Sequence, residues 1–247
     1  PLAEPGLIGT SSGAALGAVI SIQTGAYAAF ALALPFAALA GAGAAVGLIL
    51  LLAGRSARAL TLILAGIAVS ALAGALTALV LNLAPSPYAA AEIVFWMMGS
   101  LADRAMSHVW LAAPFLLIGG AVLLSTGRGL DALSLGEDAA ASLGVSLRAL
   151  RLRVIFGSAL LVGAATAVAG AVGFVGLVVP HLLRARVGAR PSALLGASAL
   201  GGAAMLLCAD IATRLIAPER DLKLGVLTAL VGAPFFLQMI RRLGREE

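Results

Sequence analysis

Asp210 and Arg214 are the clearest pair of residues in this sequence that could act through their charges. They lie four residues apart in an apolar stretch, and at that spacing on a helix an acidic and a basic side chain meet. Such a pair could dock a charged partner, or it could be an internal ion pair that neutralises two charges near a membrane boundary. Both interpretations concern binding or stability rather than catalysis.

Few residues could carry nucleotide or metal chemistry. The one lysine, Lys223, follows "RDL", which is not the glycine-rich loop that a phosphate-binding lysine requires. Cys208 lies in an apolar run, and His181 lacks sequence neighbours that would support a ligand role, so packing or hydrogen bonding is favoured for both. We therefore expect no catalytic residue, no metal and no cofactor in this chain.

A charged stretch, "GLDALSLGEDAAASLGVSLRALRLR" at 129–153, is acidic at its front and basic at its back. Ser134 and Glu137 have the spacing of a capping box, "EDAAASL" predicts a short helix ended by Gly144, and Ser146 can cap the next helix. Two short helices are more than a typical connection needs. This favours a docking element for a cytoplasmic partner over a plain solvated loop.

The elements that must position these residues are membrane helices. Of the 247 residues 62% are hydrophobic and only 11% are charged, whereas a soluble domain has about 25% charged residues. The abundant small residues suit close helix packing in a lipid bilayer. No basic patch is interleaved with aromatic residues, so we expect no nucleic-acid partner. The composition predicts an all-α, polytopic transmembrane helical bundle.

The runs without charged residues predict about eight spans, because a spanning helix needs about 20 apolar residues. The run 154–183 is long enough to cross once or twice. Two crossings place twelve of the sixteen basic residues inside and four outside, which the positive-inside rule favours. The runs are 5–54 (two spans), 59–91 (one span and an amphipathic piece), 105–127, 154–183, 191–209 and 224–240.

The second crossing of 154–183 must be short and irregular. Gly173, Gly176 and Pro180 interrupt "AVGFVGLVVPHLLR", and irregular backbone at membrane depth has to be buried in protein or line a cavity. The segment near the start, "EPGLIGTSSG", has a similar texture. Paired broken segments are a trace of inverted repeats in transporters.

Six ordered motifs resemble the FecCD-type permease family, the membrane subunits of ATP-binding-cassette (ABC) importers for iron-siderophores, haem and vitamin B12. The resemblance runs from Pro1 to about Arg242 and implies an inverted-repeat type II ABC importer permease. The family has ten spans, so we expect 1–247 to be a single transmembrane permease domain without its N-terminal spans. The motifs are "PLAEPGLIGTSSGAALG", "LILAGIAVSAL", "FWMMGSLA", "LSLGEDAAASLGV", "GAVGFVGLVVPHLLR" and "GVLTALVGAPFFL".

The resemblance also implies roles for four groups of residues. The stretch at about 129–150 matches cytoplasmic coupling helices that seat in an ATPase subunit. The coupling candidates are Glu137, Asp138, Ala140, Leu143 and Gly144. The candidates for docking a binding protein are Arg214, Arg104 and Arg220, and the cytoplasmic gate candidates are Leu2, Ala59 and Leu60. The side chains of Trp96, Met97 and Met98 could line the pathway or could be packing residues. Asp103 or Glu92 could satisfy Arg104.

The implied assembly is a homodimer of this chain in the bacterial inner membrane, with two ABC ATPase subunits that bind ATP and Mg, and with a periplasmic substrate-binding protein. Its expected function is import of a bulky iron chelate, haem or a ferric siderophore, without covalent chemistry in this chain. A vitamin B12 importer is the alternative. An ion-coupled secondary transporter would need ionisable residues near mid-membrane, where Asp210 alone is a candidate.

Overall fold

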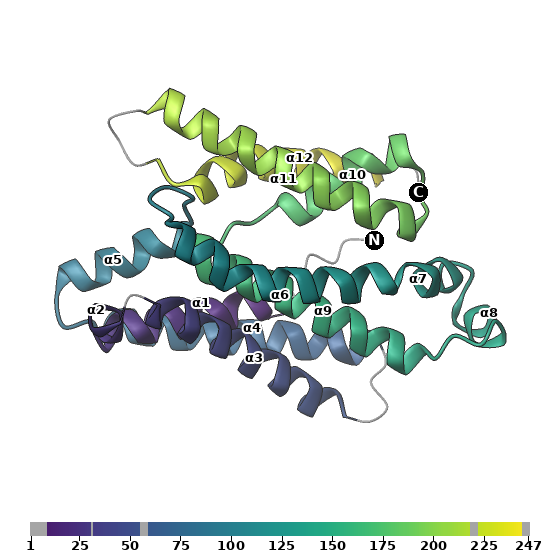
Figure 1. The fold of residues 1–247 in the computed structure, drawn as a ribbon, viewed down its shortest axis with the longest axis horizontal. Helices are drawn as coiled ribbons and strands as arrows, with labels where there is room; N and C mark the ends of the chain where they lie inside the picture. The colour runs from purple at the N-terminus through teal and green to yellow at the C-terminus, as the bar shows by residue number, and fades with distance from the viewer. Residues whose placement is uncertain (1–8, 31, 55–58, 218–221, 244–247) are drawn as a thin grey trace.

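The computed structural model of the protein describes residues 9–30, 32–54, 59–217 and 222–243, and every regular element in them is a helix (Figure 1). This confirms the predicted all-α class. The helices are α1 (Thr10–Gln23), α2 (Ala26–Ala29), α3 (Ala33–Ala53), α4 (Ala59–Asn82), α5 (Pro87–Met97), α6 (Met106–Ser125), α7 (Gly127–Leu133), α8 (Glu137–Ser142), α9 (Leu147–Ala169), α10 (Val175–Val187), α11 (Pro191–Ile216) and α12 (Leu224–Leu243).

The helices form two layers that run roughly along the long axis of the molecule. Helices α1, α3, α4, α6 and α9 pack in one layer, and α10, α11 and α12 lie together over it (Figure 1). One end of the molecule carries α7 and α8, and the other carries α2 and α5. We refer to these as the α8 end and the α5 end.

Small residues set the contact between α1 and α3. The backbones approach so closely at Gly13 and Gly41 that a methyl group built on Gly13 would lie 2.6 Å from the carbonyl oxygen of Gly41. Around this contact the core is built almost entirely from alanine, including Ala14, Ala38 and Ala167. Short side chains therefore replace the bulky core of a soluble protein, as expected where backbones pack closely in lipid.

The predicted spans are confirmed in part. Within the described residues, five helices are long and apolar enough to cross a membrane: α3, α4, α6, α9 and α11. Helix α12 has a shorter apolar part, Leu224–Gln238, while α1 and α10 have 14 and 13 residues. The count of eight spans stays a prediction. The helix after the prolines in the run 59–91 is α5, which begins at Pro87.

The chain reverses between α9 and α10, as the distribution of arginines predicts. Helix α9 runs from the α8 end toward the α5 end, residues 170–174 are irregular, and α10 leads back (Figure 1). The interruption is shorter than predicted, because Gly176 and Pro180 both lie inside helix α10 and only 170–174 lacks helical structure. Pro180 lies in the interior of α10, where it leaves the carbonyl oxygen of Gly176 without its usual helical donor.

Helix α4 presents an unpartnered apolar face. Leu60, Ile63, Leu64 and Ile67 are each 50–67% exposed in the isolated chain. Large contiguous apolar faces of this kind mark contact with lipid or with another protein.

Candidate coupling and docking surfaces

Helices α7 and α8 form a charged projection at the α8 end of the molecule (Figure 1). Glu137 and Asp138 lie in the first turn of α8, where carboxylates interact favourably with the helix dipole. Glu137 also accepts a 2.6 Å hydrogen bond and ion pair from Arg151 of α9. The projection is thereby attached to a membrane-length helix by an ion pair as well as by the chain itself.

The capping box predicted for Ser134 and Glu137 is absent. The hydroxyl of Ser134 donates a 2.6 Å hydrogen bond to the carbonyl oxygen of Asp131, near the end of α7, and α8 begins at Glu137 after the N-cap residue Gly136, without a side-chain cap. The prediction was wrong because an additional short helix, α7, ends at this point and uses the serine at its own C-terminus.

The other end of α8 is as predicted. Gly144 has a φ of +80°, and the N–H groups of Gly144 and Val145 donate to the carbonyl oxygens of Ala141 and Ala140 at 2.9 and 3.0 Å. These bonds close the helix in the manner of a glycine C-cap. The hydroxyl of Ser146 then accepts from the N–H of Ala149 at 3.4 Å, so Ser146 does cap the following helix.

That following helix is not short, which corrects the prediction of two short helices within 129–153. Helix α9 continues for 23 residues from Leu147 to Ala169, so the three arginines at the back of the charged stretch lie on the first turns of a long helix. The two short helices are α7 and α8 instead. Positive charge therefore lies where the long helix leaves the apolar region.

The five coupling candidates occupy different environments on α8. Ala140 is fully buried, whereas Leu143 is 66% exposed. Glu137, Asp138 and Gly144 are also exposed. Four of the five are thus accessible to a partner, and the fifth is not.

Asp131 is a residue at this end that the sequence did not single out. Its two carboxylate oxygens accept hydrogen bonds from the main-chain N–H of Ser192 at 2.9 Å and from the Ser192 hydroxyl at 2.6 Å. These bonds, with the charge of Arg190 adding to them, hold the pKa of Asp131 below its ordinary value. The one local signal was the start of α11, where Arg190 stands at the N-cap before Pro191 and cannot cap the helix with its side chain.

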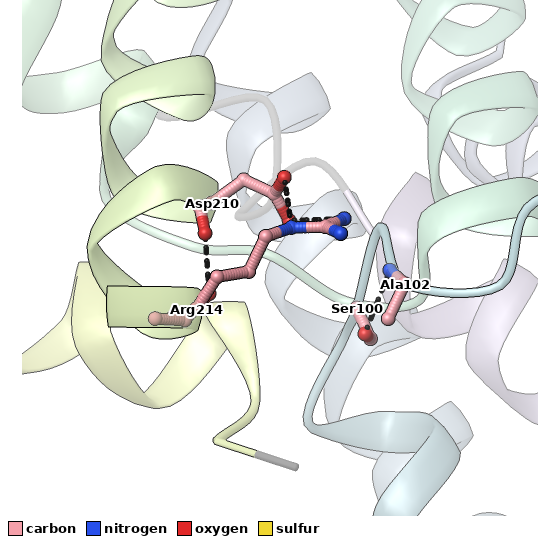
Figure 2. A network of polar contacts seen from close by, with 5 residues as sticks. Ser100, Ala102, Asp210 and Arg214 are labelled. Carbon is pink, nitrogen blue, oxygen red and sulfur yellow. Dashed lines mark hydrogen bonds and ion pairs between the residues drawn. The ribbon is translucent and has the colours of Figure 1, made fainter. Parts of the chain in front are cut away.

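Asp210 and Arg214 form the predicted pair at the α5 end, near the end of α11 (Figure 2). Nε of Arg214 donates to Oδ2 of Asp210 at 2.9 Å, and a terminal guanidinium nitrogen lies 3.4 Å from Oδ1. The Arg214 side chain is nevertheless 61% exposed. The ion pair therefore exists and still leaves most of the arginine accessible, so the two sequence-based interpretations are compatible.

The structure shows no comparable ion pair for the other two docking candidates among the residues that it describes. The Nε of Arg104 donates to the carbonyl oxygen of Ser100 at 3.4 Å, and burial lowers the pKa of Arg104 while the charge of Asp103 opposes that shift. The suggested partner Glu92 accepts a 2.9 Å hydrogen bond from the Tyr27 hydroxyl instead. Arg220 lies outside the described residues.

The gate candidates are only partly described. Leu2 lies outside the described residues, and Ala59 is described as the first residue of α4 but not for its side chain. The Leu60 side chain is exposed at the α8 end of that helix. These observations leave the gate assignment a prediction.

Trp96, Met97 and Met98 lie together where α5 ends. Trp96 packs against a buried cluster of α1, α3 and α9 residues and against a second one of α1 and α5 residues, and Met97 packs against the second cluster as well. Met97 and Met98 line a groove of about 590 Å³ together with apolar residues of α12, among them Val226 and Leu230. The groove has apolar walls and joins the end of α5 to α12.

The irregular segment 170–174 is only partly buried, from the buried Gly170 to the exposed Gly173. The N–H of Ser100 donates to the carbonyl oxygen of Ala169 at 2.8 Å, and a methyl group on Gly170 would lie 2.5 Å from the carbonyl oxygen of Trp96. Ala171, Val172 and Gly173 also line a cavity of about 360 Å³, whose polar residues include Ser11, Ser12 and Thr166. The backbone here is held by protein on one side and lines a space on the other.

Comparison with known proteins identifies the class of this chain. The model of the FecCD transport family matches residues 1–242. The hemin transport system permease of Yersinia pestis is 39% identical over 251 residues, which cover 98% of this chain and 73% of that protein. The cobalamin import system permease of Halobacterium salinarum is 38% identical over 242 residues, 98% of this chain and 64% of the relative.

A solved structure has the same fold. It is an inward-facing metal-chelate type ABC transporter, 34% identical, with a TM-score of 0.90 over 98% of this chain and 77% of that chain. These matches cover nearly all of this chain, and the relatives are longer than it is. The comparisons confirm the predicted family.

Proposed function

The chain belongs to the FecCD transport family, and from this premise we propose that it is the membrane-spanning permease subunit of an ABC importer for a bulky iron chelate. The observation that carries the proposal is the family match over residues 1–242, which includes the exposed projection α7–α8. In this proposal 1–247 acts as one permease domain, and the residues at about 129–150 are its coupling helices. ATP hydrolysis takes place in a separate ATPase subunit.

We assign the α8 end to the cytoplasm. Among the described residues this end carries most of the basic side chains: Arg128, Arg148, Arg151, Arg153, Arg184, Arg186, Arg190 and Arg241. Arg104, Arg214 and Lys223 lie at the α5 end. The excess of arginine agrees with the positive-inside rule for a bacterial inner-membrane protein.

The partners follow from the family. Two ATPase subunits, which bind ATP and Mg, would seat against α8 through Glu137, Asp138, Leu143 and Gly144. A periplasmic substrate-binding protein would dock at the α5 end through exposed arginines. The best defined of these is Arg214, whose side chain is 61% exposed although it pairs with Asp210. A second copy of the chain would complete the pathway and cover apolar surface such as the face of α4.

We propose an iron chelate, haem or a ferric siderophore, as the substrate. Relatives include permeases for hemin, for cobalamin and for Fe(3+) dicitrate, the last in Escherichia coli. The groove beside Met97 and Met98 favours a ligand with an apolar face, because its walls offer thioether and aliphatic groups and almost no charge. Vitamin B12 remains the alternative cargo.

Reconstitution tests the proposal. Proteoliposomes containing the complete permease with its ATPase subunits and the substrate-loaded binding protein should take up hemin or a ferric siderophore only when ATP is present. Cyanocobalamin and ferric citrate serve as the competing cargoes in parallel assays. Uphill uptake without the ATPase subunits, driven by a proton or sodium gradient, would contradict the proposal and favour a secondary transporter.

A further inference from the structure

The contact between Asp131 and Ser192 joins two elements that are 61 residues apart in sequence. Both oxygens of the carboxylate are used, one by the main-chain N–H and one by the hydroxyl of the same serine. Hydrogen bonds to a charged acceptor are stronger than bonds between neutral groups. The geometry therefore resists both separation and rotation of α7 relative to the start of α11.

The start of α11 depends on this contact. Pro191 has no N–H, and the N-cap Arg190 has no side-chain acceptor, so the N–H of Ser192 is the first donor of the helix. Asp131 caps α11 from another element. Gly127, one turn earlier on α7, lets the two elements approach, because a methyl group there would lie 3.1 Å from Cβ of Ser192.

Asp131 also connects the two helices that lead to the surfaces required by the proposed function, which are the coupling surface on α8 and the docking pair on α11. Helix α7 leads through 134–136 directly into α8, which carries the coupling candidates. Helix α11, Pro191–Ile216, has 26 residues and so spans about 39 Å. It runs from the α8 end to the α5 end (Figure 1), with Ser192 in its first turn and Arg214 in its last. The contact is thus the place where the coupling projection is fastened to the helix that carries the outer docking pair.

We propose that Asp131 is a positioning residue that makes α7 and α11 move as one body, so that α11 links binding-protein docking to the ATPase subunits. This inference rests on the proposed function. Its physical basis is the doubly bonded contact and the continuous helix, since coupling between distant sites requires elements whose arrangements both sites influence. Asp131 itself contacts neither cargo nor nucleotide.

The first experiment separates coupling from assembly. In the reconstituted complex, the ratio of the ATPase rate with loaded binding protein to the basal rate of the same variant should fall about fivefold or more in Asp131→Ala. Asp131→Asn, which keeps an acceptor for the Ser192 N–H, should restore most of the stimulation. Ser192→Ala, which retains the main-chain bond, should give an intermediate value. Normal stimulation in Asp131→Ala would overturn the inference.

The second experiment looks for a gain of function. In a Cys208→Ala background, Asp131→Cys and Ser192→Cys are introduced together and joined by a short thiol cross-linker, with joining measured by loss of maleimide labelling. If α7 and α11 move as one body, joining them should restore ATP-driven uptake relative to the same unjoined variant. If joining stops uptake, the two elements separate during the cycle and the inference is wrong.

The two proposals fail in different ways. If the unmodified complex shows no ATP-dependent uptake of any cargo, the proposed function is wrong. If uptake is normal and only the predicted effects of the Asp131 variants are missing, the permease assignment stands and the role of Asp131 does not.

Discussion

The main-chain N–H of Gly225 donates a 3.0 Å hydrogen bond to the carbonyl oxygen of Met98, so α12 begins directly against the end of α5. Both residues line the apolar groove. A second contact fixes the same region, because a methyl group on Gly225 would lie 3.1 Å from the carbonyl oxygen of Ala171. Three segments therefore meet at one glycine.

Gly225→Ala should destabilise the protein, because the added methyl group would also meet the carbonyl oxygen of Met98 and force the segments apart. We expect a loss of about 1–3 kcal/mol, measured as a lower midpoint of thermal unfolding in detergent. Gly202→Ala is the matched control, since its methyl group meets only Val175 at 3.7 Å. Equal midpoints for the two variants would contradict the tight contact.

Gly144→Val should weaken binding of the ATPase subunits. The residue has a φ of +80° with no atom within 4 Å of its Cβ position, so the penalty arises from backbone strain, about 1–2 kcal/mol, and not from a clash. A pull-down with the ATPase subunit measures the effect. Gly144→Asn is the control, because asparagine tolerates this conformation, and unchanged binding of the valine variant would reject the role of Gly144 at the coupling surface.

Arg214→Glu should weaken docking of the substrate-binding protein, because it removes an exposed positive charge and places a second carboxylate beside Asp210. The loss of affinity should be larger at 0.01 M salt, where the Debye length is about 30 Å, than at 1 M, where it is about 3 Å. Arg186→Glu makes the same charge change at the opposite end of the molecule. A loss that does not vary with salt would indicate a folding defect instead.

Cysteine accessibility tests whether the segment after α9 lines a cavity. In a Cys208→Ala background, Val172→Cys should react with a water-soluble maleimide, because Val172 borders the cavity of about 360 Å³. Val179→Cys should be protected from the maleimide, since Val179 is a buried residue of α10 that is only 5% exposed. Complete protection of both positions would show that water does not reach this space.

The pH dependence of stability follows from the lowered pKa of Asp131. A carboxyl group whose pKa is lower in the folded than in the unfolded protein stabilises the fold above its unfolded pKa, and this contribution is lost as pH falls through the folded pKa. The native chain should therefore unfold at a higher temperature than Asp131→Asn at neutral pH, with the difference shrinking below about pH 4. A difference that persists under strongly acidic conditions would contradict this.

Local sequence signals predicted much of the architecture. Helices α3, α4 and α6 each have a boundary close to the end of an uncharged run, because a charged side chain is costly inside a bilayer, whereas α9 begins with three arginines before its run and α11 continues through Asp210 and Arg214. Gly144 and Ser146 mark the end of α8 and the start of α9 through their own backbone chemistry. The pairing of Asp210 with Arg214 was predictable because both lie on one helix at a fixed spacing.

Contacts between distant segments were not predictable in the same way. Ser134 has a capping-box spacing, but its hydroxyl bonds to α7 because the chain forms an additional short helix that the pattern does not indicate. The contact of Asp131 with Ser192 depends on how α7 and α11 pack, and no periodicity within either segment encodes it. Likewise, the packing of Trp96 and Met97 on buried clusters and the position of Met97 and Met98 beside α12 depend on contacts between distant helices.

The apolar face of α4 has a practical consequence for handling the protein. In the single chain, an apolar surface is exposed along part of α4, formed by Leu60, Ile63, Leu64 and Ile67. Any purification has to supply hydrocarbon for that surface, as detergent tails, nanodisc lipid or a neighbouring subunit. Dilution below the critical micelle concentration would bring these faces together in solution, and the sample would precipitate.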